Sequence, residues 1–208
     1  MLVTLDGRPV ETPCGADSTL QALLDQVRAT QPPDRLIVSV AVNGRELGDD
    51  DLSNDLSCPV DAGAQIDLET GDRKELIDSA LRRVAEEFAA AEPRHGAIAE
   101  RLSSLDAAAA VREVGEIVGL WQICHRALAQ CSELLGDDLV QRLHEGRPVQ
   151  AWLDDVVAKL VEMGAALEAR DMVSLADLLR YELAPLCPAW CALLNGLADQ
   201  LRDAGPPA

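Results

Sequence analysis

Four cysteines in the second half of the chain have the types and spacing for shared chemistry. Cys124 and Cys131 are seven residues apart and Cys187 and Cys191 are four apart, so each pair lies on one face of a predicted helix. If the two helices faced each other, four thiolates could bind zinc. However, zinc fingers and ribbons use C-x2-C pairs, and Cys124 and Cys131 share an apolar stripe with Leu128. We therefore predict core packing without a metal, and keep metal or thiol binding by these four cysteines as an alternative.

Catalytic chemistry has little support elsewhere in the chain. The three histidines, His95, His125 and His144, do not lie in a serine or cysteine nucleophile motif. The sequence also has no phosphate-binding P-loop and no G-x-G-x-x-G dinucleotide motif. We therefore predict that the protein is not an enzyme and that it has no catalytic residue and no cofactor.

An acidic run at residues 49–55 invites comparison with a calcium-binding loop. Asp49, Asp50 and Asp51 are followed by Asp55. An EF-hand loop requires glycine at its sixth position and a bidentate glutamate at its twelfth, but counting from Asp49 places asparagine and valine there. The run is therefore predicted to be a solvated acidic loop that binds no metal.

Net charge argues against several classes of partner. Aspartate and glutamate number 36 against 18 lysines and arginines, which gives a net charge of −18. Such a field repels phosphate backbones and anionic membranes, so we expect no nucleic-acid or membrane binding and favour basic protein partners. The longest uncharged stretch, residues 183–198, is shorter than the ~20 apolar residues of a membrane span. With no export signal before the first strand, we expect a cytoplasmic protein, and the bias toward Arg, Ala and Asp is typical of GC-rich bacteria.

The first part of the chain begins with a predicted hairpin and a helix. "MLVTLDGRPVET" alternates apolar and polar residues around Asp6-Gly7, which indicates a tight turn between two strands. Ser18, with Gln21 three residues later, is the predicted cap of a helix with one apolar stripe. Pro32-Pro33 is expected to end that helix.

Three further strands complete a predicted sheet. "RLIVSVAVNGREL" indicates a buried strand, a turn at Asn43-Gly44 and a short return strand. "AQIDLET" indicates a last strand whose Ile66 and Leu68 face the core. The predicted order is therefore strand, strand, helix, strand, short strand and strand.

The segments "VAVNGREL" and "LSCPVDAGAQIDL", with an acidic loop between them, resemble the sulfur-carrier branch of the β-grasp, ubiquitin-like proteins. The resemblance covers residues 1–71 and implies a β-grasp domain there, although the family's Gly-Asp-x-Ile turn lacks its Asp here. Sulfur carriers of thiamin and molybdopterin synthesis act through a C-terminal Gly-Gly. In this chain "ETGDRKEL" has the single Gly71, followed by Asp72 as a predicted helix cap, and the last residues are "DAGPPA". Sulfur carriage or ubiquitin-like conjugation would require processing near Gly71, and we keep it as an alternative.

Residues 72–208 are predicted to form an all-α helical bundle, which gives the whole chain an α+β fold. Apolar residues recur there at helical spacing, and no strand pattern is found after residue 70. Three tryptophans, Trp121, Trp152 and Trp190, fall on apolar stripes and are predicted to fill the core. The expected helices are 73–92 ended by Pro93, 107–135, one with Pro148 in its first turn, and one from Met172 after a break at Asp171.

The stretch "YELAPLCPAWC" is unusual because Pro185 and Pro188 interrupt a helical pattern. Each proline removes a helical hydrogen bond and clashes with the preceding turn, so the helix should break or kink here. The bend either lets the last helix wrap around the bundle or shapes a groove for a partner helix. In the second case Tyr181 and Glu182 would lie at the rim of the groove, near Pro185, Pro188 and Trp190.

The sequence as a whole favours a protein-interaction module. We expect an adaptor, regulator or export-type chaperone that binds a basic or helical protein partner through the bundle and the β-grasp surface. In composition alone, the helical half is similar to the small acidic helical chaperones of flagellar and related export systems. Self-association of the helical half into a two-fold homodimer is a further expectation.

Overall fold

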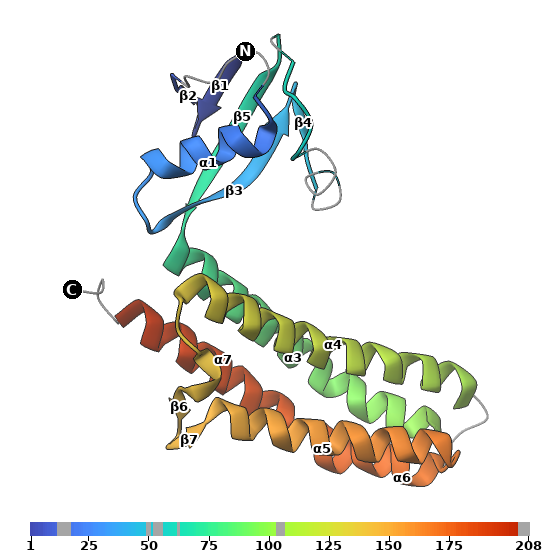
Figure 1. Cartoon of the computed structure of the whole chain (residues 1–208). Coiled ribbons are helices and arrows are strands. Elements are labelled where there is room, and N and C mark those ends of the chain that lie inside the picture. The colour runs from blue at the N-terminus through green and yellow to red at the C-terminus, as the bar shows by residue number, and fades with distance from the viewer. Residues whose placement is uncertain (12–17, 49–50, 52–55, 62, 103–106, 204–208) are drawn as a thin grey trace. The chain divides into compact units, whose positions relative to one another are not determined.

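The computed structural model describes residues 1–11, 18–48, 51, 56–61, 63–102 and 107–203. The structure is mixed α+β, with a small sheet near the N-terminus followed by helices (Figure 1). Two compact units, Met1–Leu76 and Ile77–Ala208, meet inside a helix, a few residues beyond the boundary expected at residue 71. None of the described helices is long and apolar enough to cross a membrane.

The N-terminal unit, Met1–Leu76, is a five-stranded sheet with one helix against it. The order across the sheet is β2-β1-β5-β3-β4; β1 and β5 pair in parallel and the other pairs are antiparallel. One core joins Leu23 and Val27 of the helix to Val40, Ile66 and Leu68 of the sheet, so the two core residues predicted for the last strand are confirmed. The elements are β1 (Leu2–Leu5), β2 (Arg8–Pro9), α1 (Leu20–Thr30), β3 (Arg35–Val42), β4 (Arg45–Glu46) and β5 (Gln65–Asp72).

Both predicted hairpin turns of this unit are confirmed. The first central residues, Asp6 and Asn43, have φ of 50° and 52°, and Gly7 and Gly44 follow with φ of 75° and 78°. Positive φ at both central positions is the type I′ turn, whose twist matches that of the flanking strands. The turns therefore fix the register of β1 with β2 and of β3 with β4.

The predicted helix caps had different outcomes. The N-cap of α1 is Thr19, whose hydroxyl accepts the Ala22 amide at 3.2 Å, so the prediction of Ser18 is wrong by one residue. The chain reaches α1 one residue later because the Ser18 carbonyl accepts the amide of Val60. The Asp72 cap is confirmed, since its Oδ1 accepts the amides of the second and third residues of the following helix at 2.9 and 3.1 Å.

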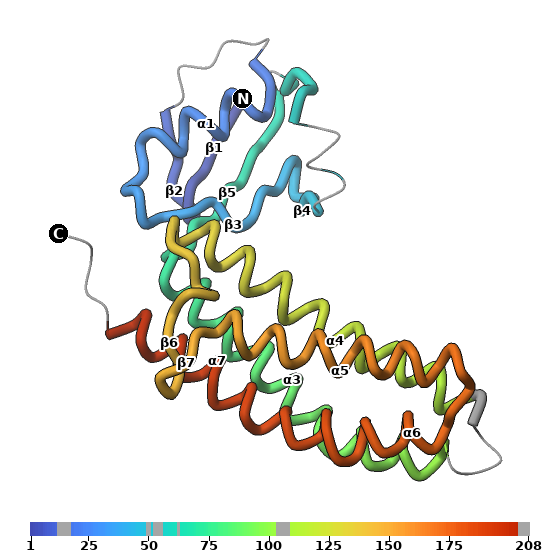
Figure 2. Tube along the Cα trace, turned by 60° about the horizontal axis from the view of Figure 1, so that its bottom comes forward, coloured from blue at the N-terminus to red at the C-terminus, as the bar shows by residue number. Residues whose placement is uncertain are grey.

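The C-terminal unit, Ile77–Ala208, is a helical bundle around a single hydrophobic core. In the tube view, α3, α4, α5 and the segment from α6 to α7 lie alongside one another (Figure 2). The elements that form it are α3 (Arg73–Leu102), α4 (Ala107–Leu135), η1 (Leu139–Gln141), β6 (Leu143–His144), β7 (Arg147–Pro148), α5 (Val149–Glu168), α6 (Met172–Asp177), η2 (Leu178–Leu183) and α7 (Leu186–Asp203).

Two of the expected boundaries in this unit are wrong. Pro93 lies inside α3, which continues to Leu102. The ring of Pro93 is on the exposed side, and burial of Phe88, His95 and Ile98 on the same helix outweighs the ~3 kcal/mol that an interior proline costs.

The second correction is a short antiparallel hairpin, β6 with β7, where no strand was expected. Its turn residues Glu145 and Gly146 have φ of 52° and 76°, again the type I′ pattern. Pro148 therefore ends a strand and occupies the N-cap position of α5, instead of the first helical turn.

The core of the bundle is centred on aromatic rings from three helices. Phe88 of α3 lies 4.4 Å from Trp121 of α4 and 6.1 Å from Trp190 of α7, between ring centroids. The two tryptophans meet edge to face at 5.4 Å, and both are at most 4% exposed. Their predicted role as core residues is thus confirmed, whereas Trp152 is only partly buried, beside His144.

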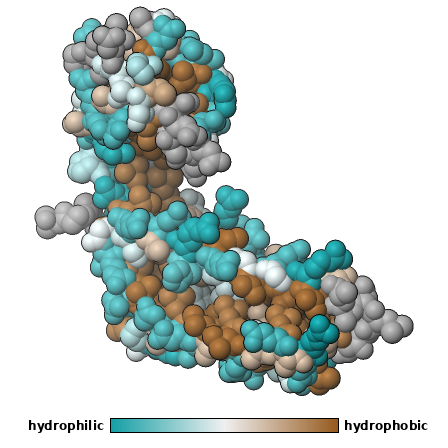
Figure 3. Space-filling view, turned by 45° about the vertical axis from the view of Figure 1, so that its right-hand side comes forward, coloured by the Kyte–Doolittle hydropathy of each residue, from teal (hydrophilic) through white to brown (hydrophobic). Residues whose placement is uncertain are grey.

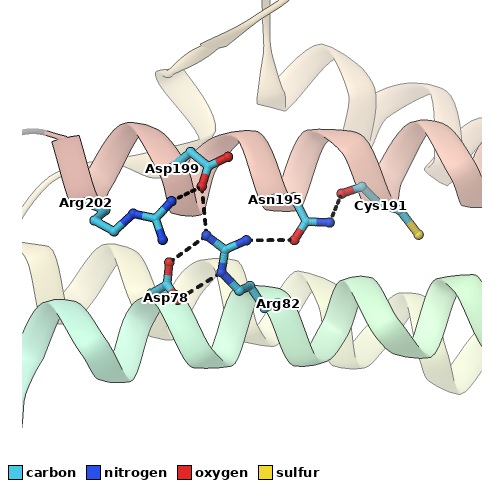
Figure 4. Close-up of polar contacts among 6 residues, drawn as sticks. All are labelled: Asp78, Arg82, Cys191, Asn195, Asp199 and Arg202. Atoms are coloured by element: carbon cyan, nitrogen blue, oxygen red, sulfur yellow. Dashed lines mark hydrogen bonds and ion pairs between the residues drawn. The ribbon is translucent and has the colours of Figure 1, made fainter.

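A polar network joins α3 to α7 along one seam of the bundle (Figure 4). Arg82 donates to Asp78 on its own helix at 2.9 and 3.0 Å, and across to Asp199 at 2.8 Å and Asn195 at 3.3 Å. Arg202 donates to the same Asp199 oxygen at 2.5 Å. These bonds raise the pKa of Arg82 and lower that of Asp199, so the network stays charged and holds the two helices in register.

Candidate functional site

The thiols proposed as metal ligands are packing residues in the structure. Cys124, Cys131 and Cys187 are at most 2% exposed. Burial raises their pKa to about 12, about 11 and about 12, so they are protonated at neutral pH. Cys191 donates its Sγ–H to the carbonyl of Ala85 at 3.0 Å. Within the described part of the chain, no three His, Cys, Asp or Glu side chains are grouped so that they could hold a metal.

Gly71, where processing would have to occur, is built into the sheet. It pairs with Leu36 in the β3–β5 ladder. A Cβ atom at Gly71 would lie 3.1 Å from Cγ1 of Val38 and 3.3 Å from the Leu76 methyl groups. A larger residue would therefore crowd these side chains, so the glycine allows strand and helix to pack closely, and β5 passes directly into α3 without a free tail.

The predicted calcium loop is only partly described. Asp49, Asp50 and Asp55 lie outside the described residues. Asp51 accepts two hydrogen bonds from Arg45, at 2.9 and 3.0 Å. Its carboxylate is thus engaged in an ion pair on the surface of the N-terminal unit.

The residues proposed for a partner groove separate into surface and core. Tyr181 is 63% exposed, and Glu182, Pro185 and Pro188 are also exposed. Trp190 is 0% exposed and belongs to the aromatic core, so it does not line a surface groove. Exposed and buried residues therefore alternate along the proline stretch, with Leu183, Cys187 and Trp190 anchored in the bundle core.

The backbone before Pro185 takes a wider turn than an α-helix. The segment η2 (Leu178–Leu183) is π-helical, and the Ala184 amide donates to the carbonyl of Leu179 at 3.0 Å, five residues back. The cause is Pro185, which has no amide proton and whose ring would clash with the preceding turn of a regular helix. The Ala184 carbonyl accepts the amide of Cys187 at 3.1 Å. Pro188 lies in the first turn of α7, where a proline is tolerated.

Tyr181 and Glu182 do lie on a groove, but most of its other residues come from α5, α6 and the turn between them. This acidic groove has a volume of about 560 Å³. Its floor is small and apolar because α5 ends in a group of alanines, and the left-handed residue Arg170, with φ of 55°, turns the chain sharply into α6. The lining residues are Glu162, Ala165, Ala166, Ala169, Asp171, Ser174, Asp177, Leu178, Tyr181 and Glu182.

Four carboxylates surround the acidic groove, and no lysine or arginine is among its lining residues. Asp171 accepts the amide and hydroxyl of Ser174 at 3.0 and 2.7 Å, and these hydrogen bonds lower its pKa. Lys159, at the edge, is 3.2 Å from Glu162 and 3.6 Å from Glu182. These contacts raise the pKa of Lys159, the larger part coming from Glu162. The groove thus combines an apolar floor with a negative rim, which fits a basic amphipathic segment.

Two further grooves were not predicted from the sequence. One, of about 750 Å³, lies between α3 and α4 and has buried Val84, Ile117 and Leu120 among its lining residues. The other, of about 630 Å³, lies between α4 and α5. In the space-filling view, apolar residues form a broad area on the helical unit, bordered by polar ones (Figure 3). The sequence signal for the first groove was Gly119, a glycine inside a predicted helix. In the structure it lines this groove, and a Cβ added there would meet nothing within 4 Å.

Comparison with known proteins bears on the helical unit. Residues 79–193 match a family model described as Domain of unknown function (DUF8042). The matched segment runs from α3 into α7 and includes every lining residue of the acidic groove. No curated protein and no solved structure matches the chain.

Proposed function

We propose that this protein, which belongs to the DUF8042 family, is a non-enzymatic protein-interaction module. It acts as an adaptor, regulator or export-type chaperone in the cytoplasm, and its acidic groove binds a basic helical segment of a partner protein. The observation that carries the proposal is the groove itself, an alanine floor bordered by Glu162, Asp171, Asp177 and Glu182.

Geometry and charge together support a helical ligand. A groove between neighbouring helices accepts the apolar face of an amphipathic helix, and small floor residues let its backbone approach closely. Lysine or arginine side chains at the edges of that face would reach the four carboxylates. Tyr181, which is 63% exposed at the rim, offers an aromatic surface of the kind enriched at protein interfaces.

For the N-terminal unit we propose a β-grasp, ubiquitin-like domain that provides a second docking surface. Its support is the strand order β2-β1-β5-β3-β4, with the parallel β1–β5 pair in the middle and α1 sharing a core with the sheet. Leu2 and Val38 are 52% and 48% exposed, so the sheet has apolar surface left for a partner.

Observations on the two alternatives favour the binding proposal over them. Sulfur carriage would require cleavage at Gly71, inside a paired strand against which Val38 and Leu76 pack. Thiol or metal chemistry would require thiolates, but burial keeps Cys124, Cys131 and Cys187 protonated.

Charge reversal in the groove tests the proposal. The tagged protein is used to capture partners from its native cells, in parallel with the double variant Asp177→Lys and Glu182→Lys. A matched control, Glu133→Lys with Asp203→Lys, makes the same change of charge at two exposed positions outside the groove. We expect a partner that is captured by the wild type and the control and lost with the groove variant, and whose binding weakens with salt. Equal capture by all three proteins would contradict the assignment.

A further inference from the structure

The groove between α4 and α5 differs from the acidic groove in both charge and shape. Five of its residues, including Arg126, come from α4 and four from α5, and no carboxylate is among them. On α5, Val157 and Val161 are 55% and 67% exposed and lie one helical turn apart. Valine forms helices less well than alanine, so helix formation does not explain two exposed valines. The lining residues are Trp121, Gln122, His125, Arg126, Ala129, Leu153, Val156, Val157 and Leu160.

Opposite charges flank this apolar surface. Arg126 on α4 is exposed, and among the described residues it has no ion-pair partner, although acids outnumber bases two to one in this chain. Asp154 on α5 is exposed one turn before Val157, and it accepts a hydrogen bond from Gln150 at 2.8 Å. One patch therefore carries a groove, an apolar ridge, a free cation and a carboxylate.

We propose that a second copy of this chain occupies the α4–α5 groove. A two-fold interface must be complementary to itself, because each surface meets its own copy. Here the ridge of Val157 and Val161 enters the groove of the second copy, and Arg126 faces Asp154 of the partner subunit. A basic partner would be repelled by Arg126 and an acidic one by Asp154, whereas a second copy satisfies both groups. The proposal does not depend on the acidic groove, which remains open on another side of α5.

The two interactions should respond to salt in opposite directions. Each chain carries −18, so two copies repel each other at long range and added salt weakens that repulsion. The contact between apolar ridge and groove is not screened, and screening of the repulsion between two chains of −18 outweighs screening of the two Arg126–Asp154 pairs, so the dimer should become tighter as salt rises. Binding of a basic segment in the acidic groove should become weaker under the same conditions.

Sedimentation velocity of the full chain tests the proposed dimer. The wild type should sediment as a dimer in moderate salt, and Val161→Glu should weaken association at least about tenfold because it buries a charge in the interface. The control is Val173→Glu, since Val173 is 70% exposed on α6 and does not line the groove. A monomeric wild type, an intact Val161→Glu dimer or a monomeric Val173→Glu control would overturn the proposal.

A charge swap tests which groups face each other. Arg126→Asp and Asp154→Arg should each weaken the dimer, because each places like charges opposite one another. The double variant should restore association, since the pair is re-formed with its signs exchanged. If the double variant is as weak as the single variants, the proposed facing of α4 and α5 is incorrect.

Discussion

Protonation of His95 should destabilise the helical unit at mildly acidic pH. His95 is 0% exposed on α3, and its Nδ1 lies 2.7 Å from the carbonyl of Ala91. Because a carbonyl only accepts, Nδ1 carries the proton and Nε2 is unprotonated. Nε2 is buried and has no hydrogen-bond partner among the described residues. A second proton there would be a buried charge without an acceptor, and burial accordingly lowers the pKa of His95.

The size and direction of the effect follow from proton linkage. In the unfolded chain the imidazole titrates near pH 6.5, whereas the folded protein holds it neutral to lower pH. Below pH 6.5 the unfolded state therefore binds more protons, and unfolding becomes easier by at most about 1.4 kcal/mol per pH unit. Because the unfolded imidazole is half protonated at pH 6.5, the loss between pH 6.5 and 5.5 is about 1 kcal/mol. For a unit of about 130 residues this corresponds to a fall in Tm of about 4 °C.

The aspartates of the helical unit with lowered pKa values do not contribute in this window. The pKa values of Asp155, Asp171 and Asp199 lie below that of an unperturbed aspartate, which is itself far below this pH range. Their stabilisation is complete above the unfolded pKa and is lost only as pH falls below about 4. The His95 effect can therefore be measured separately from acid denaturation.

The assay is chemical or thermal unfolding of the helical unit, followed by circular dichroism from pH 7.5 to 5.5. His95→Leu should remove most of the slope in stability. A wild type with equal stability across this range, or a His95→Leu variant with the wild-type slope, would refute the reasoning.

Three other predictions follow from helix positions and thiol burial. Gly119→Ala should stabilise the protein by about 0.5–1 kcal/mol in urea unfolding, because the new Cβ meets nothing within 4 Å; Gly196→Ala should lose that gain, since its Cβ would lie 3.1 Å from an imidazole ring. Pro93→Ala should stabilise α3 by about 1–3 kcal/mol, whereas Pro188→Ala, in the first turn of α7, should change stability by less than about 0.5 kcal/mol. An alkylating reagent should modify exposed Cys58 in the folded protein and the buried cysteines of the helical unit only after unfolding, as read by peptide mass spectrometry. Equal changes in stability for the two glycine variants or for the two proline variants would contradict these assignments, as would rapid labelling of the buried thiols.

Features determined by a few neighbouring residues could be predicted from the sequence. The Asp6-Gly7 and Asn43-Gly44 turns depend on residues that tolerate positive φ, and Asp72 caps α3 through its own side chain. The helix was wrongly predicted to end at Pro93, because the free-energy cost of a proline inside a helix is outweighed by the burial of residues on either side of it. The hairpin at Glu145-Gly146 was missed because its first turn residue is a glutamate, which rarely adopts positive φ, whereas the two predicted turns have Asp6 and Asn43 there.

The candidate groove was predictable only in part. The prolines indicated a disturbed helix, which led to Tyr181 and Glu182. The alanine floor on α5 and the carboxylates of α6 come together only through the turn at Arg170. Trp190 was predicted both as a core residue and as a groove residue, because helical spacing alone does not show on which side of the bend a residue is buried; in the structure it is 0% exposed, which agrees with the core role only.

Crosslinking from the groove tests the central claim most directly. A photo-reactive phenylalanine derivative replaces Tyr181 in the full chain, and the same group at Val173, exposed on α6 outside the groove, is the control. After irradiation in native cells, crosslinked peptides are identified by mass spectrometry. We expect position 181, but not position 173, to capture a segment of another protein that is rich in lysine or arginine and has helical periodicity. Crosslinks from both positions to the same segment, or acidic segments at position 181, would contradict the proposed acidic docking groove.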